Sequence, residues 1–327
     1  YRKNMAYVPR SEPASYAAGG KRVHVDTVEW IYIPDAATTM NALVAGEIDF
    51  WESPAVDLVP SMEGNADITI KVIDPLGTQG WLRPNHLNPP FDNPKARQAL
   101  THMVNQEDYL RAIIGDEKFW SACPAYFMCG TPLDTDIGSE ALVKQDLEKA
   151  KALLKEGGYN GETLILMDPT DIPVLHGASL VTAQMLRDIG AKVEVQAMDW
   201  STLTSRRAER KSIADGGWNI FHTYSTGADV SSPIANIGIS GGCVEKAWFG
   251  WPCDRDGPDS LEGLRDAFSE ESDPVKQKAI ATKLQARAYE VVPYVNYGQW
   301  FQPTAYRSSL KGVLISPVPF FWNIELN

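Results

Sequence analysis

A serine in a glycine-rich stretch is the first candidate for catalysis. Residues 238–242, Gly-Ile-Ser-Gly-Gly, match the G-x-S-x-G pattern in which α/β-hydrolases present a nucleophile. Such a nucleophile needs a hydrophobic strand before it and a helix after it. Here Asn236 precedes the match and Cys243 follows it, so this context favours a glycine-rich loop. A secreted serine hydrolase that uses Ser240 remains the alternative from the class of enzymes.

The histidines and glycine motifs do not predict a metal or cofactor site. The histidines lie at positions 24, 86, 102, 176 and 222, with no H-E-x-x-H and no pair at metal-ligand spacing. The sequence has neither a P-loop nor a G-x-G-x-x-G motif. We therefore expect no metal and no cofactor, and we expect that the protein is not an enzyme.

The four cysteines are spaced as two local pairs, Cys123 with Cys129 and Cys243 with Cys253. Neither pair shows the C-x-x-C spacing that is typical of metal sites. Each pair lies in a loop that contains proline or glycine, which favours two short-range disulfides and an oxidising compartment. The alternative is four unpaired buried thiols.

Three candidates for ligand binding lie on or after predicted strands. Ligands of open α/β sheets bind outside the carboxyl ends of the strands. Trp200 follows a predicted strand at 192–197, and Asp229 follows one at 218–224. Tyr297 lies on a later strand. From the residue types alone, the two aromatic residues are equally consistent with core positions, and Asp229 before Ser-Ser-Pro is typical of an Asx-turn.

Alternating strands and helices must position these residues. Apolar periodicity predicts strands at 163–167, 192–197 and 218–224, with helices between them at 177–189 and 202–211. Strands separated by helices of this length indicate βαβ units, and therefore a largely parallel sheet covered on its faces.

Further elements flank this middle region. We expect helices over 94–104 with Asn93 as N-cap, over 139–156 with Ser139 as N-cap, and over 274–291 with Asp273 as N-cap. Before residue 90 the patterns predict strands at 23–33, 48–51 and 68–73 and helices at 38–45 and 54–65. The proline and glycine breaks of residues 74–88 indicate a crossing into a second lobe.

The composition limits the class of protein. The 327 residues carry a net charge of -12, which argues against a polyanionic partner such as nucleic acid. No apolar run approaches the length that spans a bilayer, so we expect no membrane-spanning segment. The sequence begins at Tyr1 without Met or a signal peptide, and we therefore expect that this start is processed or truncated.

One long stretch resembles a known family. Residues 85–100 read Asn-x-x-x-Pro-Pro-Phe-Asp-Asn-x-x-x-Arg-x-Ala-Leu. This stretch resembles the signature of the family 5 extracellular solute-binding proteins, the peptide, dipeptide and nickel receptors of bacterial ABC importers. The short segments at 19–21, 45–49 and 321–323 also resemble sequences of this family.

The resemblance implies an α/β fold with the two-lobe architecture of periplasmic binding proteins. In this scheme residues 1–77 form a partial, incomplete lobe I, residues 78–298 form lobe II as a βαβ sheet-and-helix domain, and residues 299–327 return to lobe I. It also implies a periplasmic location.

The resemblance assigns roles to particular residues. Trp200 matches a family tryptophan near the ligand, and Asp229 matches the aspartate that receives the α-ammonium group in peptide receptors. Arg207, seven residues after the tryptophan, matches an arginine that meets carboxylates in some members. The charged run 206–211 also favours a solvated helix face for Arg207. Tyr297 matches an aromatic ligand contact.

In lobe I, the resemblance places Trp51 and Glu52 near the peptide backbone. It implies the substrate-binding component of an ABC import system, which captures a small solute, most consistently a peptide, and passes it to a membrane permease. The alternative within this class is a receptor for a non-peptide solute such as an opine, a sugar or a metal chelate.

Overall fold

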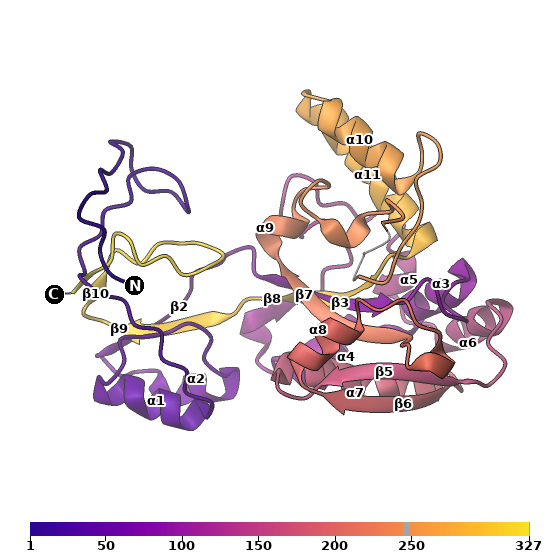
Figure 1. Ribbon diagram of the computed structural model, residues 1–327, viewed down its shortest axis with the longest axis horizontal. Helices are drawn as coiled ribbons and strands as arrows, with labels where there is room; N and C mark the ends of the chain where they lie inside the picture. Colours follow the sequence, from indigo (N-terminus) through magenta and orange to yellow (C-terminus); the bar gives the residue numbers. More distant parts are fainter. Residues whose placement is uncertain (245–248, 327) are drawn as a thin grey trace. The chain divides into compact units, whose positions relative to one another are not determined.

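The computed structural model describes residues 1–244 and 249–326. The chain forms two compact units, which Figure 1 shows by sequence colour. Unit 1 contains residues 1–77 and 301–327, and unit 2 contains residues 78–300. Unit 2 continues to Trp300 because its strand β8 (Val295–Trp300) ends at that residue.

A six-stranded sheet in the order β4-β8-β3-β7-β5-β6 forms the centre of unit 2. Its other strands are β3 (Thr78–Pro84), β4 (Trp120–Ser121), β5 (Thr163–Pro169), β6 (Lys192–Met198) and β7 (Ile220–Thr226). Only β7, β5 and β6 run parallel, and the remaining pairings are antiparallel. The prediction of a largely parallel sheet is therefore wrong for half of the sheet, because β4, β8 and β3 form only antiparallel pairs.

Strand β3 was the main omission of the sequence-based prediction, which assigned residues 74–88 to a crossing. All of β3 except Thr78 is buried. Gly80 looked like a break, but a Cβ atom at that position would lie 2.0 Å from the ring of Tyr297. This glycine therefore permits close packing inside a strand.

The helices of unit 2 largely follow the predicted pattern. They are α3 (Pro94–Met103), α4 (Gln106–Ile113), α5 (Glu140–Val143), α6 (Leu147–Glu156), α7 (Pro173–Asp188), α8 (Trp200–Arg206), α9 (Gly227–Val230), α10 (Leu261–Glu270) and α11 (Pro274–Val291). Asn93 caps α3 by accepting a hydrogen bond from Lys95 N, as predicted. Ala96, Ala99 and Leu100 form its fully buried face.

The single helix predicted from Ser139 is wrong. The chain forms α5 and then a separate α6, and Asp146 caps α6 by accepting from Lys149 N. The hydroxyl of Ser139 instead donates to Asp136 O. A new helix begins after Asp146 because the Asp146 carboxylate accepts from a backbone N–H in the first turn of α6.

Two helices cover opposite faces of the parallel strands. Helix α7 contacts β5, β6 and β7, and its Thr182 hydroxyl lies 2.7 Å from Nε2 of His222 on β7. On the other face, Met167 and Phe221 pack against Leu203 of α8. The sheet therefore buries both faces here, as a parallel sheet requires.

Unit 1 contains a three-stranded antiparallel sheet in the order β1-β9-β2. Its elements are α1 (Ala36–Ala45), β1 (Phe50–Trp51), α2 (Val59–Met62), β2 (Ile68–Val72), β9 (Pro303–Arg307) and a small pair, β10 (Leu310–Lys311) with β11 (Glu325–Leu326). Leu43, Met62 and Ala305 belong to its buried core. Gly46 ends α1 in the left-handed conformation, as the sequence predicted.

Two predictions for unit 1 are wrong. Residues 23–33 form no strand, and their only ladder contact is an isolated bridge between Thr27 and Arg2. A strand needs a hydrogen-bonded neighbour, and among the described residues no strand pairs with this segment. The helix predicted over 54–65 is also shorter, because the 3₁₀ turn Val56–Leu58 precedes α2.

Both predicted disulfides are confirmed. Cys123 bonds to Cys129 with a Cα–Cα distance of 5.8 Å, and Cys243 bonds to Cys253 with a Cα–Cα distance of 4.3 Å. The alternative of four unpaired thiols is therefore wrong.

Candidate functional site

The carboxyl ends of β7, β5 and β6 meet at one edge of the sheet, because these three strands are parallel. We call this region the carboxyl edge. It comprises residues 168–171 at the end of β5, 199–200 after β6 and 225–229 at the end of β7. Helices α8 and α9 begin within this region, and α7 begins shortly after it (Figure 1). Amide groups at helix starts and polar side chains therefore gather at this edge.

Asp229 is exposed at the carboxyl edge and its carboxylate is held in place. Its backbone N–H donates to Thr226 Oγ1 at 3.3 Å, and the same hydroxyl donates to Asp229 Oδ2 at 3.0 Å. Thr226 is thus the N-cap of α9 and its hydroxyl also holds the Asp229 carboxylate, an arrangement that differs from the Asx-turn considered from the sequence. The oriented, solvent-accessible carboxylate is suited to accept hydrogen bonds from a cation.

Trp200 links the ends of two neighbouring strands. It is the first residue of α8, and its backbone N–H donates to Asp171 Oδ1 at 2.8 Å. The preceding Asp199 caps α8 by accepting from Thr202 N, and the hydrogen bonds from Thr202 lower the pKa of this carboxyl. The indole is partly buried, so one part of it remains available to a ligand.

Arg207 lies against aromatic rings. Its guanidinium carbon is 5.0 Å from the ring centroid of Trp200 and 5.6 Å from that of Phe221. Burial lowers the pKa of Arg207 to about 10, so the side chain stays charged at neutral pH. The structure therefore brings Trp200 and Arg207 together as a cation–π pair and does not place Arg207 on a solvated helix face.

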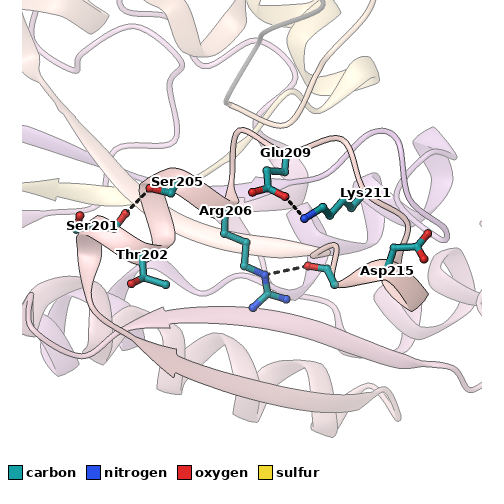
Figure 2. Close-up of a pocket in the computed structure, with 8 residues that line it drawn as sticks. Ser201, Thr202, Ser205, Arg206, Glu209, Lys211 and Asp215 are labelled. Atoms are coloured by element: carbon teal, nitrogen blue, oxygen red, sulfur yellow. Dashed lines mark hydrogen bonds and ion pairs between the residues drawn. The ribbon is translucent and has the colours of Figure 1, made fainter.

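Helix α8 also bounds a depression of about 400 Å³, lined by residues such as Ser201, Arg206 and Asp215 (Figure 2). Its polar groups bind one another. Arg206 donates to Gln196 Oε1, Gly216 O and Gly217 O, and Lys211 pairs with Glu209. Because these charged groups already have partners, the depression presents fewer available polar groups to a ligand than the carboxyl edge does.

Tyr297 is fully buried in the core of unit 2. Its ring stacks on that of Tyr109 at a centroid distance of 5.0 Å, and its hydroxyl donates to Thr223 O at 3.3 Å. Burial raises the pKa of its phenol well above the ordinary value. In this position Tyr297 supports the sheet and offers no surface to a ligand.

Trp51 and Glu52 lie in unit 1. Trp51 pairs in register with Ala305 and packs against the core of that unit. Glu52 follows it, and partial loss of water contact raises the pKa of its carboxyl. Both residues line a cavity of about 500 Å³ within unit 1, together with aromatic residues such as Trp30 and Phe321.

Asp171 is a residue of the edge that the sequence-based prediction missed. It follows the strand that was predicted at 163–167, so the rule that selected Trp200 and Asp229 would also have selected Asp171. The structure shows that Asp171 accepts a hydrogen bond from the backbone N–H of Trp200 at the start of α8. Nothing in the sequence indicates this contact.

The Ser240 loop lacks the arrangement of a hydrolase. Ser240 follows a 3₁₀ turn, Ile237–Ile239, in place of the strand that a nucleophile elbow requires. Its hydroxyl donates to Glu262 Oε1 at 2.9 Å, and Gly241 N donates to the same oxygen at 2.7 Å. Arg265 balances the carboxylate from 2.7 Å. This network secures a loop.

Residues 1–244 and 249–326 contain no group of three or more His, Cys, Asp or Glu side chains placed to hold a metal ion. In the same part of the chain, no helix is both long and apolar enough to cross a bilayer.

Comparisons with known proteins agree with this architecture. The family model described as "Bacterial extracellular solute-binding proteins, family 5 Middle" matches residues 1–247. The chain belongs to this family. As a family 5 protein it shares 37% identity with a probable peptide ABC transporter periplasmic-binding protein of Sinorhizobium fredii, an alignment that covers 99% of this chain and 61% of that protein.

Solved structures of other binding proteins share the fold. One is the periplasmic binding protein DppA from Helicobacter pylori in complex with the peptide STSA, with 23% identity and a TM-score of 0.73 over 90% of this chain and 56% of that one. Another is AgaA from A. tumefaciens R10 with agropinic acid, with 20% identity and a TM-score of 0.71 over 90% and 59%. The predicted α/β fold of periplasmic binding proteins is confirmed. This family 5 chain spans about three fifths of the length of its Sinorhizobium relative.

Proposed function

We propose that this chain captures peptides for an ABC import system in the periplasm and passes them to a membrane permease. The observation that carries the proposal is the exposed Asp229 carboxylate, held by Thr226 at the carboxyl edge of the sheet. The family membership and the name of the Sinorhizobium relative support this role. In this proposal the protein binds its ligand and catalyses no reaction.

Each site residue has a role in this proposal. Asp229 accepts hydrogen bonds from the α-ammonium group of the peptide, a charge-assisted contact worth roughly 1.5–3 kcal/mol. Trp200 supplies an apolar wall, and Arg207 behind it meets a ligand carboxylate or polarises the ring. Tyr297 supports the sheet below.

We assign unit 2 to lobe II and unit 1 to lobe I of a receptor that closes by hinge motion. In unit 1, Trp51 and Glu52 remain the proposed contacts to peptide backbone. Glu52 suits this role because it follows a strand and its side chain is accessible.

A receptor for an opine is the second candidate. It is favoured by the Arg207 guanidinium beside Trp200, since opines carry carboxylates, and by the likeness in fold to AgaA. The stronger sequence identity belongs to the protein named for peptides, and we therefore prefer peptides.

The test is a calorimetric titration with the Asp229→Asn variant, which preserves shape and removes the charge. Removing one partner of such an ion pair costs about 3–5 kcal/mol when it is buried, so we expect peptide affinity to fall by roughly one to three orders of magnitude. N-acetylation of the peptide should cause a similar loss in the wild type and little further loss in the variant.

Asp266→Asn is the matched control, because Asp266 is an exposed aspartate on α10. It should leave peptide affinity unchanged. If Asp229→Asn binds peptides as tightly as the wild type, Asp229 only accepts from Thr226 at the start of α9 and the site assignment is wrong.

A further inference from the structure

Unit 1 contains a cavity that includes none of the residues proposed for peptide binding. Its volume is about 460 Å³, which is within the range of sites that hold small molecules. Three segments that are far apart in the sequence line it, residues 1–7, 21–30 and 319–322. It borders the cavity that Glu52 lines, but neither Trp51 nor Glu52 belongs to its walls. We call it the basic aromatic cavity.

Backbone groups hold the three segments together. Lys3 N donates to Asp26 O at 2.9 Å, which ties the first segment to the second. Arg22 N donates to Asn323 Oδ1 at 3.1 Å, which ties the second segment to the end of the third. The fold itself therefore positions the walls of the cavity.

Aromatic rings form much of the wall. The rings of Phe320 and Trp322 stack with their centroids 4.2 Å apart, and Trp30 meets Phe321 edge to face with centroids 5.5 Å apart. Trp30 and Tyr7 are 57% and 42% exposed, so aromatic surface remains open to solvent at the border. Rigid rings offer contact area to a planar apolar ligand at a low cost in side-chain entropy.

The charged side chains of the lining are mostly basic. Arg2, Lys3 and Lys21 line the cavity, with Asp26 as the acid. Within residues 1–244 and 249–326, none of the three basic side chains pairs with a carboxylate. The Lys21 ammonium lies 5.0 Å from the ring centroid of Trp322. This local excess of positive charge, in a chain of net charge -12, favours an anionic ligand.

One further donor of the wall is unused. The indole N–H of Trp322 is buried, and it donates to no acceptor in the part of the chain that the structure describes. A buried donor without an acceptor is unfavourable. A carboxylate oxygen that reached the Trp322 ring would satisfy it.

These features together select the chemistry of the ligand. A cationic ligand would meet three like charges. An aliphatic anion would leave the rings without an aromatic partner, and a phosphate would carry a strongly hydrated charge into a largely apolar lining. An aromatic ring with one carboxylate matches both parts of the wall. Arg2 can hold the carboxylate through two parallel hydrogen bonds, and Lys21 adds a point charge.

We propose that the basic aromatic cavity binds a small aromatic carboxylate, with the ring against the aromatic wall and the carboxylate at Arg2 and Lys21. It is a second ligand site, and it does not depend on the proposed capture of peptides.

The experiment is a calorimetric titration of the purified full chain with three probes. They are 2-naphthoate, 2-naphthamide, which keeps the rings without the charge, and cyclohexanecarboxylate, which keeps the charge without an aromatic ring. We expect the wild type to bind 2-naphthoate roughly 10- to 100-fold more tightly than 2-naphthamide, the range of a charge-assisted hydrogen bond. It should bind 2-naphthoate roughly 3- to 10-fold more tightly than cyclohexanecarboxylate.

Two kinds of variant separate charge from ring. Arg2→Gln/Lys21→Gln removes both proposed carboxylate contacts and should reduce the preference for acid over amide to below about threefold. Each single substitution should reduce this preference in part, and circular dichroism checks the fold of each variant. Trp30→Leu should weaken both naphthyl probes equally and leave their ratio unchanged.

Lys71→Gln is the matched control, since Lys71 is an exposed lysine on β2 of the same unit and lies outside the cavity. It should leave every affinity unchanged, as should Asp229→Asn in unit 2. Three results would overturn the inference: no binding of 2-naphthoate, equal affinity for acid and amide, or an acid preference that the double variant retains. A loss of 2-naphthoate binding in Asp229→Asn would also overturn it, because the probe would then occupy the peptide site. The proposed function stands in each of these cases, since peptides test it separately.

Discussion

The two units differ in how their apolar residues are covered. In unit 2, helices α7 and α8 lie on opposite faces of the parallel strands, and β8 is buried throughout. In unit 1, Trp30, Ile31 and Tyr32 are 57%, 60% and 89% exposed. The segment that carries them has the alternating pattern of a strand, yet it forms none. An alternating pattern defines the two faces of a strand, but only a neighbouring strand can supply the hydrogen bonds.

The same contrast applies to polar residues. At the carboxyl edge of unit 2, Asp168, Asp171 and Asp199 each hold a specific donor. In unit 1, the cavity that Glu52 lines is bounded mainly by apolar side chains, with a few acidic ones such as Glu29 and Asp49. Unit 2 therefore offers oriented polar groups, whereas unit 1 offers mostly apolar surface.

The largest expected effects come from truncating a core leucine in each unit. Leu100 of unit 2 and Leu43 of unit 1 are both fully buried. Leucine-to-alanine changes at such sites cost about 3–5 kcal/mol. We expect Leu100→Ala to cost more, because the smaller core around Leu43 can relax more easily, and hydrogen exchange should rise chiefly in the unit that carries the change.

Leu180→Ala is the control, since Leu180 is 51% exposed on α7. It should change the free energy of unfolding by less than about 0.5 kcal/mol. A larger loss for Leu43→Ala than for Leu100→Ala would reverse the comparison between the units.

Removing the disulfides should affect unit 2 alone. Both bonds lie there and close short loops, with sequence separations of 6 and 10. Loop entropy predicts a cost of about 2–3 kcal/mol for each bond. Urea unfolding of the Cys123→Ser/Cys129→Ser and Cys243→Ser/Cys253→Ser variants should show this loss, while hydrogen exchange in unit 1 stays the same. Unchanged stability in both variants would show that the bonds contribute nothing.

A smaller, pH-dependent effect is expected at Asp254 in unit 2. Burial raises the pKa of this carboxyl, but the hydrogen bonds from Arg287 and from Leu261 N lower it by more, so the net pKa is depressed. A depressed folded-state pKa stabilises the fold at neutral pH, and this stability is lost as pH falls through that pKa.

Asp254→Asn should therefore cost about 1–2 kcal/mol at pH 7 and should flatten the decline in stability between about pH 5 and 3. Asp266→Asn again serves as the exposed control. If the stability of Asp254→Asn depends on pH as that of the wild type does, the contact between Asp254 and Arg287 does not contribute to stability.

The sequence predicted local features well. The Asn93 cap and the buried face of α3 follow from nearby residue types, as does the end of α1 at Gly46. Strand β3 was missed because Gly80 is explained only by the ring of Tyr297, which is more than two hundred residues away in sequence. Non-local packing of this kind leaves no signal in a local pattern.

At the candidate site, too, the sequence predicted local features and missed contacts between distant residues. The strand-end rule selected Trp200 and Asp229, and both lie at the carboxyl edge. The contact between Arg207 and Phe221 depends on how α8 lies on the sheet. The hydrogen bond between Asp168 and His176 depends on a strand, a turn and a helix folding together. Such contacts require the fold before they can be recognised.

The most direct test of the central claim is a crystal structure of the purified protein with bound tetra-alanine. The claim is that the carboxyl edge of unit 2 receives the ligand. We predict that the peptide ammonium lies within hydrogen-bond distance, about 3 Å, of the Asp229 carboxylate. A peptide that binds elsewhere, with Asp229 in contact only with Thr226 and Ser225, would contradict it.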